Sequence, residues 1–100
     1  MFEEIIEPTK LFFSKNISNF PLINERIVAE KYGIEVLNLI KNLRKEFYKS
    51  EAWKKYTNDN WNIVEKEFKT DCLKKYPLCC NEIIELFWWG YSFCIWNGAF

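Results

Sequence analysis

The last part of the chain, from Leu86 to Phe100, constrains the fold most, because its 15 residues carry no charged side chain. Almost every position is apolar, so periodicity alone does not separate a buried helix from a pair of strands that turns near Gly90. The length and the polar start at Asn81 favour a buried helix that ends near Gly98. We expect it to be the central element of the fold. Its aromatic residues are Phe87, Trp88, Trp89, Tyr91, Phe93, Trp96 and Phe100.

This apolar segment is too short to span a membrane as a helix. A spanning helix needs about 20 apolar residues. Extending the segment backward meets Glu85 and Glu82, whose charges are costly in lipid. We therefore predict no membrane span. An exposed part of the aromatic surface would instead contact a partner, or a second copy in a homodimer.

Two helices are predicted in the first third of the chain. Pro8 suits the first turn of a helix, because its missing N–H would have no partner there, and this helix would run to Lys15. Pro21 would open the second helix, which ends before Gly33 because glycine readily adopts the left-handed cap conformation. The apolar stripe of the second helix is Ile23, Ile27, Val28 and Tyr32.

Two longer helices are predicted in the middle of the chain. The first spans residues 34–49, with residue 56 as its furthest limit, and the second spans 60–76 and stops at Pro77. Apolar residues recur in both at the three- and four-residue spacing that is typical of a buried helix face. They are Val36, Leu37, Ile40, Leu43 and Phe47 in the first, and Trp61, Val64, Phe68 and Cys72 in the second.

Together these segments predict an all-α fold. Apolar residues make up 49% of the 100-residue chain, which excludes disorder, and this length corresponds to one domain, residues 1–100. Three glycines and three prolines are few for the turns of an all-β protein. We therefore predict a small bundle of four to five helices around an aromatic-rich C-terminal helix.

Residues for catalysis or metal binding are scarce. Histidine, the commonest general base and metal ligand, is absent. The glycines are isolated, so we find no phosphate-binding loop. The cysteines follow the pattern C-x₆-C-C-x₁₃-C, which lacks the paired spacing of structural zinc sites. We predict a protein with no catalytic residue, no cofactor and no metal.

The cysteines and the start of the chain both indicate the cytoplasm. The chain opens Met1-Phe2-Glu3-Glu4, whereas export signals begin basic and continue apolar. A domain of this size buries enough surface to fold without disulfides, so we expect the thiols to be reduced.

Residues 27–47 resemble a helix-turn-helix. Ala29 stands four residues before Gly33, and Leu39 six residues after it, which matches the small-residue and turn positions of such a motif. The zero net charge argues against a dedicated nucleic-acid binder, which needs basic residues for phosphate contacts. A DNA-binding regulator and an ordinary helical hairpin are the two interpretations. In a regulator, the second helix would present Glu35, Asn38, Lys41 and Asn42 to the edges of the DNA bases.

Another candidate surface mixes basic and aromatic residues between Lys41 and Tyr56. Such a mixture can stack bases and hold phosphates, or form a contact surface for an acidic protein. It is equally typical of a solvated helix face whose lysine stems cover core aromatics. The candidate binding residues in this stretch are Arg44, Lys45, Tyr48, Trp53, Lys54 and Lys55.

In size, lack of catalytic motifs and bias toward Lys, Asn, Ile and Phe, the chain resembles the small cytosolic immunity proteins that neutralise bacterial toxins. These include the immunity proteins of contact-dependent growth inhibition. The resemblance implies tight one-to-one binding that blocks the active site of a toxin, often a nuclease. It also implies acidic residues that imitate phosphate, for which Glu65, Glu67 and Asp71 are the candidates. A phage-encoded inhibitor of a host defence protein would have the same profile.

Overall fold

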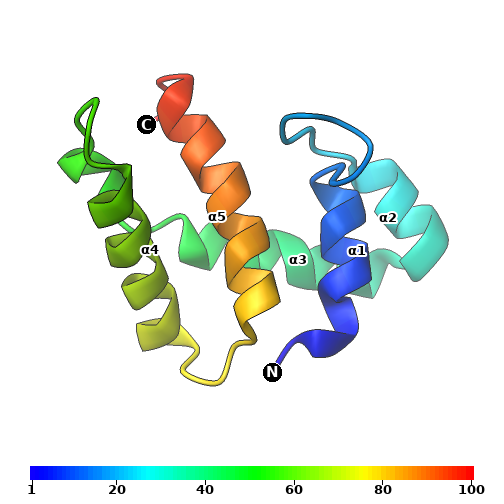
Figure 1. Cartoon of the computed structure of the whole chain (residues 1–100). Coiled ribbons are helices and arrows are strands. Elements are labelled where there is room, and N and C mark those ends of the chain that lie inside the picture. The colour runs from blue at the N-terminus through cyan, green and yellow to red at the C-terminus, as the bar shows by residue number, and fades with distance from the viewer.

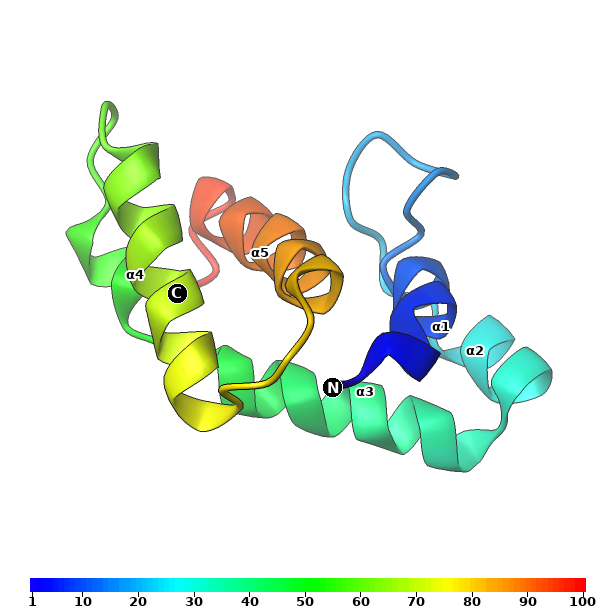
Figure 2. The ribbon, with the colours of Figure 1, turned by 60° about the horizontal axis from the view of Figure 1, so that its bottom comes forward.

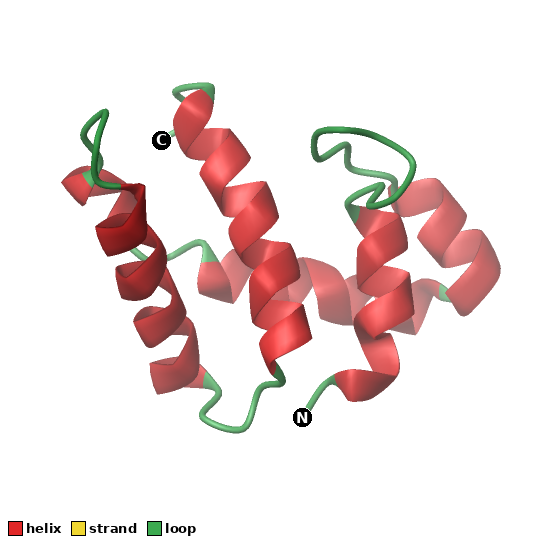
Figure 3. Cartoon of the chain, viewed as in Figure 1, coloured by secondary structure: helices red, strands yellow, loops and turns green.

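The computed structural model describes all residues, 1–100, and contains helices and loops but no strand (Figure 3). The all-α prediction is confirmed. None of the helices combines the length and the apolar character that crossing a membrane requires. The elements are η1 Glu3–Ile5, α1 Ile6–Phe12, α2 Glu25–Tyr32, α3 Ile34–Phe47, η2 Ala52–Lys55, α4 Trp61–Lys75 and α5 Asn81–Trp96, where η marks a short 3-10 helix.

Helix α5 occupies the middle of the fold. It lies between α1 and α4 and contacts both, while α3 runs across these helices on one side (Figures 1 and 2). Helix α2 packs at the far end of the molecule, against α1 and α3. The predicted arrangement, a bundle around the aromatic C-terminal helix, is confirmed.

The apolar C-terminal segment forms a helix and not a pair of strands. Buried positions such as Ile83, Phe87 and Tyr91 recur at helical spacing and define the inner face of α5. The Phe87 ring meets the rings of Phe13 and Phe47 edge-on, at centroid distances of 5.3 and 5.1 Å. Aromatic rings from three parts of the chain therefore meet in one core, in the geometry that such rings prefer.

Tyr91 ties α5 to the turn that follows α3. Its buried hydroxyl donates to the Ser50 carbonyl oxygen at 2.8 Å and accepts from the Trp53 backbone N–H at 3.0 Å. Gly90, the residue directly before Tyr91, allows the end of α3 to approach α5 closely, because a Cβ at this position would overlap the Tyr48 hydroxyl. Both residues therefore hold α5 against the segment that follows α3.

A cap ends α5 at Trp96, two residues before the predicted end near Gly98. Gly98 adopts a φ of 67°, and its N–H donates to the Ile95 carbonyl oxygen. The Ala99 N–H donates to the Cys94 carbonyl oxygen. These two bonds define a Schellman cap, for which glycine is the preferred residue.

The first helix is displaced from its predicted position of Pro8–Lys15. Helix α1 already begins at Ile6 and ends at Phe12. Ser14 and Asn16 adopt positive φ angles of 58° and 71°, which end the helix in a series of turns. Pro8 still lies in the first turn, where it costs no hydrogen bond.

The second helix begins at Glu25, so the prediction that Pro21 opens it is wrong. The Leu22 and Asn24 N–H groups donate to backbone carbonyls at the end of α1, at 3.1 and 2.9 Å. These bonds between segments hold residues 21–24 outside any helix. The local proline signal does not reveal them.

The late start of α2 changes which of its apolar residues are buried. Val28 is buried as predicted, but Ile23 and Ile27 are 43% and 41% exposed. The predicted apolar stripe therefore covers the core only in part. Ile23, which lies in the loop between α1 and α2, instead adds exposed apolar surface to that loop.

The two middle helices lie close to their predicted ranges. Helix α4, Trp61–Lys75, differs by one residue at each end from the prediction of 60–76. Helix α3 ends at Phe47, so its extension to residue 56 is wrong, because a turn separates it from η2. The buried residues of α3 are Leu37, Ile40, Leu43 and Phe47.

Candidate functional site

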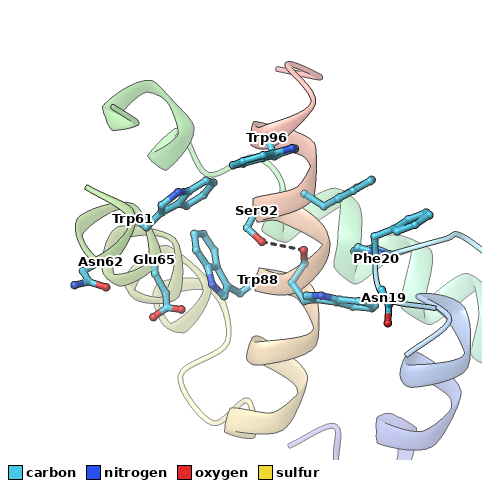
Figure 4. A pocket seen from close by; sticks show the side chains of 11 residues that line it. Asn19, Phe20, Trp61, Asn62, Glu65, Trp88, Ser92 and Trp96 are labelled. Atoms are coloured by element: carbon cyan, nitrogen blue, oxygen red, sulfur yellow. Dashed lines mark hydrogen bonds between the residues drawn. The ribbon is translucent and has the colours of Figure 1, made fainter. Parts of the chain in front are cut away.

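A groove of about 360 Å³ lies along the outer face of α5, between α4 and the loop that follows α1 (Figure 4). We call it the aromatic groove. Its polar lining includes Glu65 of α4 and Ser92 of α5. Its aromatic lining residues are Phe20, Trp61, Trp88, Trp89, Phe93 and Trp96.

Helical spacing places two of the indoles in line on α5. Trp88, Ser92 and Trp96 are four residues apart, so they lie on one face of the helix. Trp61 is the first residue of α4, and its ring lies 6.1 Å from that of Trp88 at an interplanar angle of 75°. Figure 4 shows Trp61, Trp88 and Trp96 around a common space. The Ser92 hydroxyl donates to the Trp89 carbonyl oxygen at 3.0 Å, within α5.

The loop between α1 and α2 forms the opposite edge of the groove. Phe20 stacks on Phe93 with a centroid distance of 5.7 Å and an interplanar angle of 10°. The loop is fixed at its base, where the Ser14 hydroxyl donates to the Leu22 carbonyl oxygen at 2.7 Å. Apolar side chains on this edge remain open to solvent: Ile17, Phe20, Leu22 and Ile23 are all exposed.

Glu65 is the one charged side chain that lines the aromatic groove. Its carboxylate lies 3.7 Å from the Lys69 ammonium, which also forms an ion pair with Glu85. One lysine therefore serves two carboxylates. Since both pairs are partly exposed to solvent, the attraction within them is weak.

A second hollow of about 440 Å³ continues the groove toward the start of α5. It shares Glu65, Trp88, Trp89 and Ser92 with the aromatic groove and adds Lys10, Lys15, Glu82 and Glu85. The Lys15 ammonium lies 4.2 Å from the centroid of a Trp89 ring, in a cation–π contact. The Glu7 carboxylate, which accepts a hydrogen bond from Lys10, raises the pKa of that ammonium.

The predicted basic and aromatic surface divides into an inner and an outer part. Tyr48 packs edge-on against Tyr91 at 5.4 Å, and burial raises the pKa of the Tyr48 phenol. Trp53 stacks on Phe100 at 5.7 Å. Arg44 lies with its guanidinium carbon 5.3 Å from the Tyr48 ring centroid. The aromatics of this stretch therefore face the core.

The lysines of the same stretch lie on the surface. Lys45, Lys54 and Lys55 are exposed. Lys54 pairs with Glu51, and Lys55 lies 3.1 Å from Glu67. This placement favours the interpretation of a solvated face over core aromatics.

The three acidic candidates on α4 lie on different sides of the helix. Glu65 faces the aromatic groove. Glu67 pairs with Lys55, and Asp71 accepts a hydrogen bond from the Ser50 hydroxyl at 2.6 Å. A rotation of about 100° per residue places the last two together and Glu65 away from them. Of the three, only Glu65 is positioned to act together with the indoles of the groove.

The predicted helix-turn-helix segment is a tight hairpin. Gly33 alone, with a φ of 96°, joins α2 to α3. A DNA-binding motif uses a turn of three or four residues to set the angle between its helices. On the exposed side of α3, Lys41 pairs with Glu25 at 3.0 Å. The hairpin geometry favours the interpretation as ordinary packing.

The cysteines are free thiols. Burial raises the pKa of Cys72 to about 12 and that of Cys79 to about 11, which keeps both thiols protonated near neutral pH. No group of three His, Cys, Asp or Glu side chains is placed to hold a metal ion.

Sequence reasoning anticipated part of this groove and missed the rest. The aromatic surface of residues 86–100 was expected to contact a partner where exposed, but Trp61 was assigned to the core stripe, and Phe20 was given no role. The sequence indicates a binding role for Trp61 and Phe20 only weakly, because each is a single aromatic residue beside a polar cluster. No family model, no curated protein and no solved structure matches the chain.

Proposed function

We propose that this chain is a non-catalytic binding protein that neutralises a cognate toxin by one-to-one contact, with the aromatic groove at the centre of the contact surface. The observation that carries the proposal is the placement of three indoles, those of Trp61, Trp88 and Trp96, on one hollowed surface. Tryptophan is the residue type most enriched at binding hot spots, which lie in pockets surrounded by weaker contacts.

The exposure of two groove side chains supports a role outside folding. Trp96 is 73% exposed and Phe20 48% exposed, so much of their apolar area is not used by the core. Exposed apolar surface at the edge of the groove continues along the loop after α1. Contiguous surface of this kind is typical of protein interfaces.

The resemblance to cytosolic immunity proteins supplies the class of partner. A nuclease toxin recognises phosphate with basic side chains, and Glu65 offers a carboxylate among the indoles. A phage-encoded inhibitor of a host defence protein would use the same surface. The toxin proposal is the one that the following experiment tests.

The chain is co-expressed in the cytoplasm with candidate toxin domains encoded next to it, and the proteins are separated by gel filtration. We expect a one-to-one complex and loss of the toxin's activity. Separate elution of every pair, with toxicity unchanged, would refute the proposal. Elution of the chain alone as a dimer that Trp96→Ala dissociates would instead assign the groove to a homodimer.

Two exposed positions provide a matched pair of variants. Trp96→Ala removes a groove indole and should weaken the complex about 30-fold or more, as for an interface hot spot. Leu78→Ala changes an equally exposed apolar residue, 78% exposed, on the turn between α4 and α5. We expect Leu78→Ala to leave binding unchanged.

A further inference from the structure

We infer that the aromatic groove receives the guanidinium group of an arginine side chain from the partner, held by the indole faces of Trp61 and Trp88 and by the Glu65 carboxylate. This inference rests on the proposed function, because it names the chemistry by which a protein partner is recognised. It also predicts a property of the isolated chain that can be measured without any partner.

The indoles supply surfaces for a cation. The Trp61 and Trp88 rings, 6.1 Å apart at 75°, border the groove from two directions, and Trp96 borders it from a third (Figure 4). Tryptophan gives the strongest cation–π attraction of the aromatic side chains, over distances up to about 6 Å from the ring centroid. A cation in this space would lie against more than one ring face.

The charge of the lining fits a cation and opposes an anion. Glu65 is the charged group of the aromatic groove, and it shares Lys69 with Glu85. These three groups carry two negative charges and one positive charge, and the cations of Lys10 and Lys15 line the neighbouring hollow and not the aromatic groove. The Glu65 side chain is 39% exposed, so an incoming guanidinium can reach its carboxylate.

The chain itself already uses one ring of the groove in this way. The Lys15 ammonium lies 4.2 Å from the centroid of the Trp89 ring. The other cation–π contacts of the chain involve Tyr32, Tyr48 and Trp53, so the faces of Trp61 and Trp88 carry no cation of the chain's own. One indole of the groove is therefore engaged by an internal cation. Trp61 and Trp88 pack on one side against Tyr56 and Phe68 and line the groove with the rest of their surface.

Arginine fits better than lysine for two reasons. Its guanidinium is planar and weakly hydrated, so it stacks on an indole at a smaller cost of desolvation than an ammonium. It also presents two N–H groups side by side, which match the two oxygens of a carboxylate. Glu65 beside the Trp88 ring offers both kinds of contact at once (Figure 4).

The test titrates the isolated chain with N-acetyl-arginine amide and with the citrulline analogue, which has the same shape but no charge. Chemical shifts of the indole N–H groups report binding. We expect saturable shifts of Trp61, Trp88 and Trp96 and affinity for the arginine compound about fivefold to tenfold higher. Equal affinity for the two compounds, or no saturable shift of these indoles, would overturn the inference.

Two substitutions on α4 separate a specific contact from general attraction. Glu65→Gln should abolish the preference for arginine over citrulline, whereas Glu67→Gln, on the opposite side of the helix, should retain it. An equal loss of the arginine preference in both variants would show a general effect of charge and overturn the inference. Arginine binding without any toxin complex would instead contradict only the proposed function, and a toxin complex without arginine binding only this inference.

Discussion

Both faces of α5 carry aromatic residues, but the two faces lie in opposite environments. On the inner face, the side chains of Phe87 and Tyr91 are completely buried. On the outer face, Trp88 and Trp89 are half-buried, and Trp96 is mostly exposed. Aromatic content therefore does not decide whether a residue of this helix stabilises the fold. The neighbouring elements decide it.

The inner face is covered because α1, α3 and α4 all bring side chains to it. On the outer face, α4 and the loop after α1 stand far enough apart to leave the aromatic groove between them. This difference predicts that inner substitutions change the free energy of unfolding, whereas outer ones change binding. Five substitutions on α5 test that division.

Phe87→Ala should have the largest effect on stability. Its ring contacts Phe13 and Phe47, and its removal leaves a cavity where the rings of α3 and the end of α1 meet. We expect a loss of about 3–5 kcal/mol in the free energy of unfolding, measured by urea denaturation. A loss below about 1 kcal/mol would show that the inner face is not the stabilising one.

Tyr91→Phe removes a single oxygen from the same face. The Ser50 carbonyl and the Trp53 N–H would each lose a partner inside the protein. Because buried polar groups without partners are costly, we expect a loss of about 1–3 kcal/mol. An unchanged unfolding midpoint in urea would mean that water replaces the hydroxyl.

Gly90→Ala tests the close approach of α5 to α3. The new Cβ would overlap the Tyr48 hydroxyl and lie 2.6 Å from Phe13 Cε1. Overpacking costs about 1–3 kcal/mol, whereas alanine gains up to about 1 kcal/mol in helix propensity. We expect a net loss of about 1–2 kcal/mol by urea denaturation.

Ser92→Ala provides the control for Gly90→Ala, because it lies two residues further along α5 and lines the groove. Its stability should stay within about 0.5 kcal/mol of the parent chain. If Gly90→Ala were stabilising, helix propensity would outweigh the steric overlap, and the close contact of Gly90 with Tyr48 and Phe13 would be disproved.

The fold was predictable where burial follows the period of a helix. In α3, Ile40, Leu43 and Phe47 repeat at helical spacing, and their burial agrees with the prediction. The start of α2 was not predictable, since Pro21 marks a helix start but hydrogen bonds from Leu22 and Asn24 to the end of α1 hold that segment outside the helix. Contacts between distant segments leave no local pattern.

The candidate site was predictable only in part, for the same reason. An aromatic residue looks identical in sequence whether it faces the core or solvent. Tyr48 and Trp53 were candidates for binding, yet both contact the inner side of α5 or its tail. Trp61 was a core candidate and lines the groove. The packing of α3 and α4 around α5 determines which aromatics remain accessible.

Trp96→Ala should have as small an effect on stability as Ser92→Ala, although it removes the largest side chain of the five. Because Trp96 is 73% exposed, its truncation leaves no buried cavity, and we expect the free energy of unfolding to change by less than about 0.5 kcal/mol. Urea denaturation of this variant beside Phe87→Ala compares the two faces directly. A loss of 2 kcal/mol or more would place Trp96 in the stabilising core and remove the distinction between a folding face and a binding face.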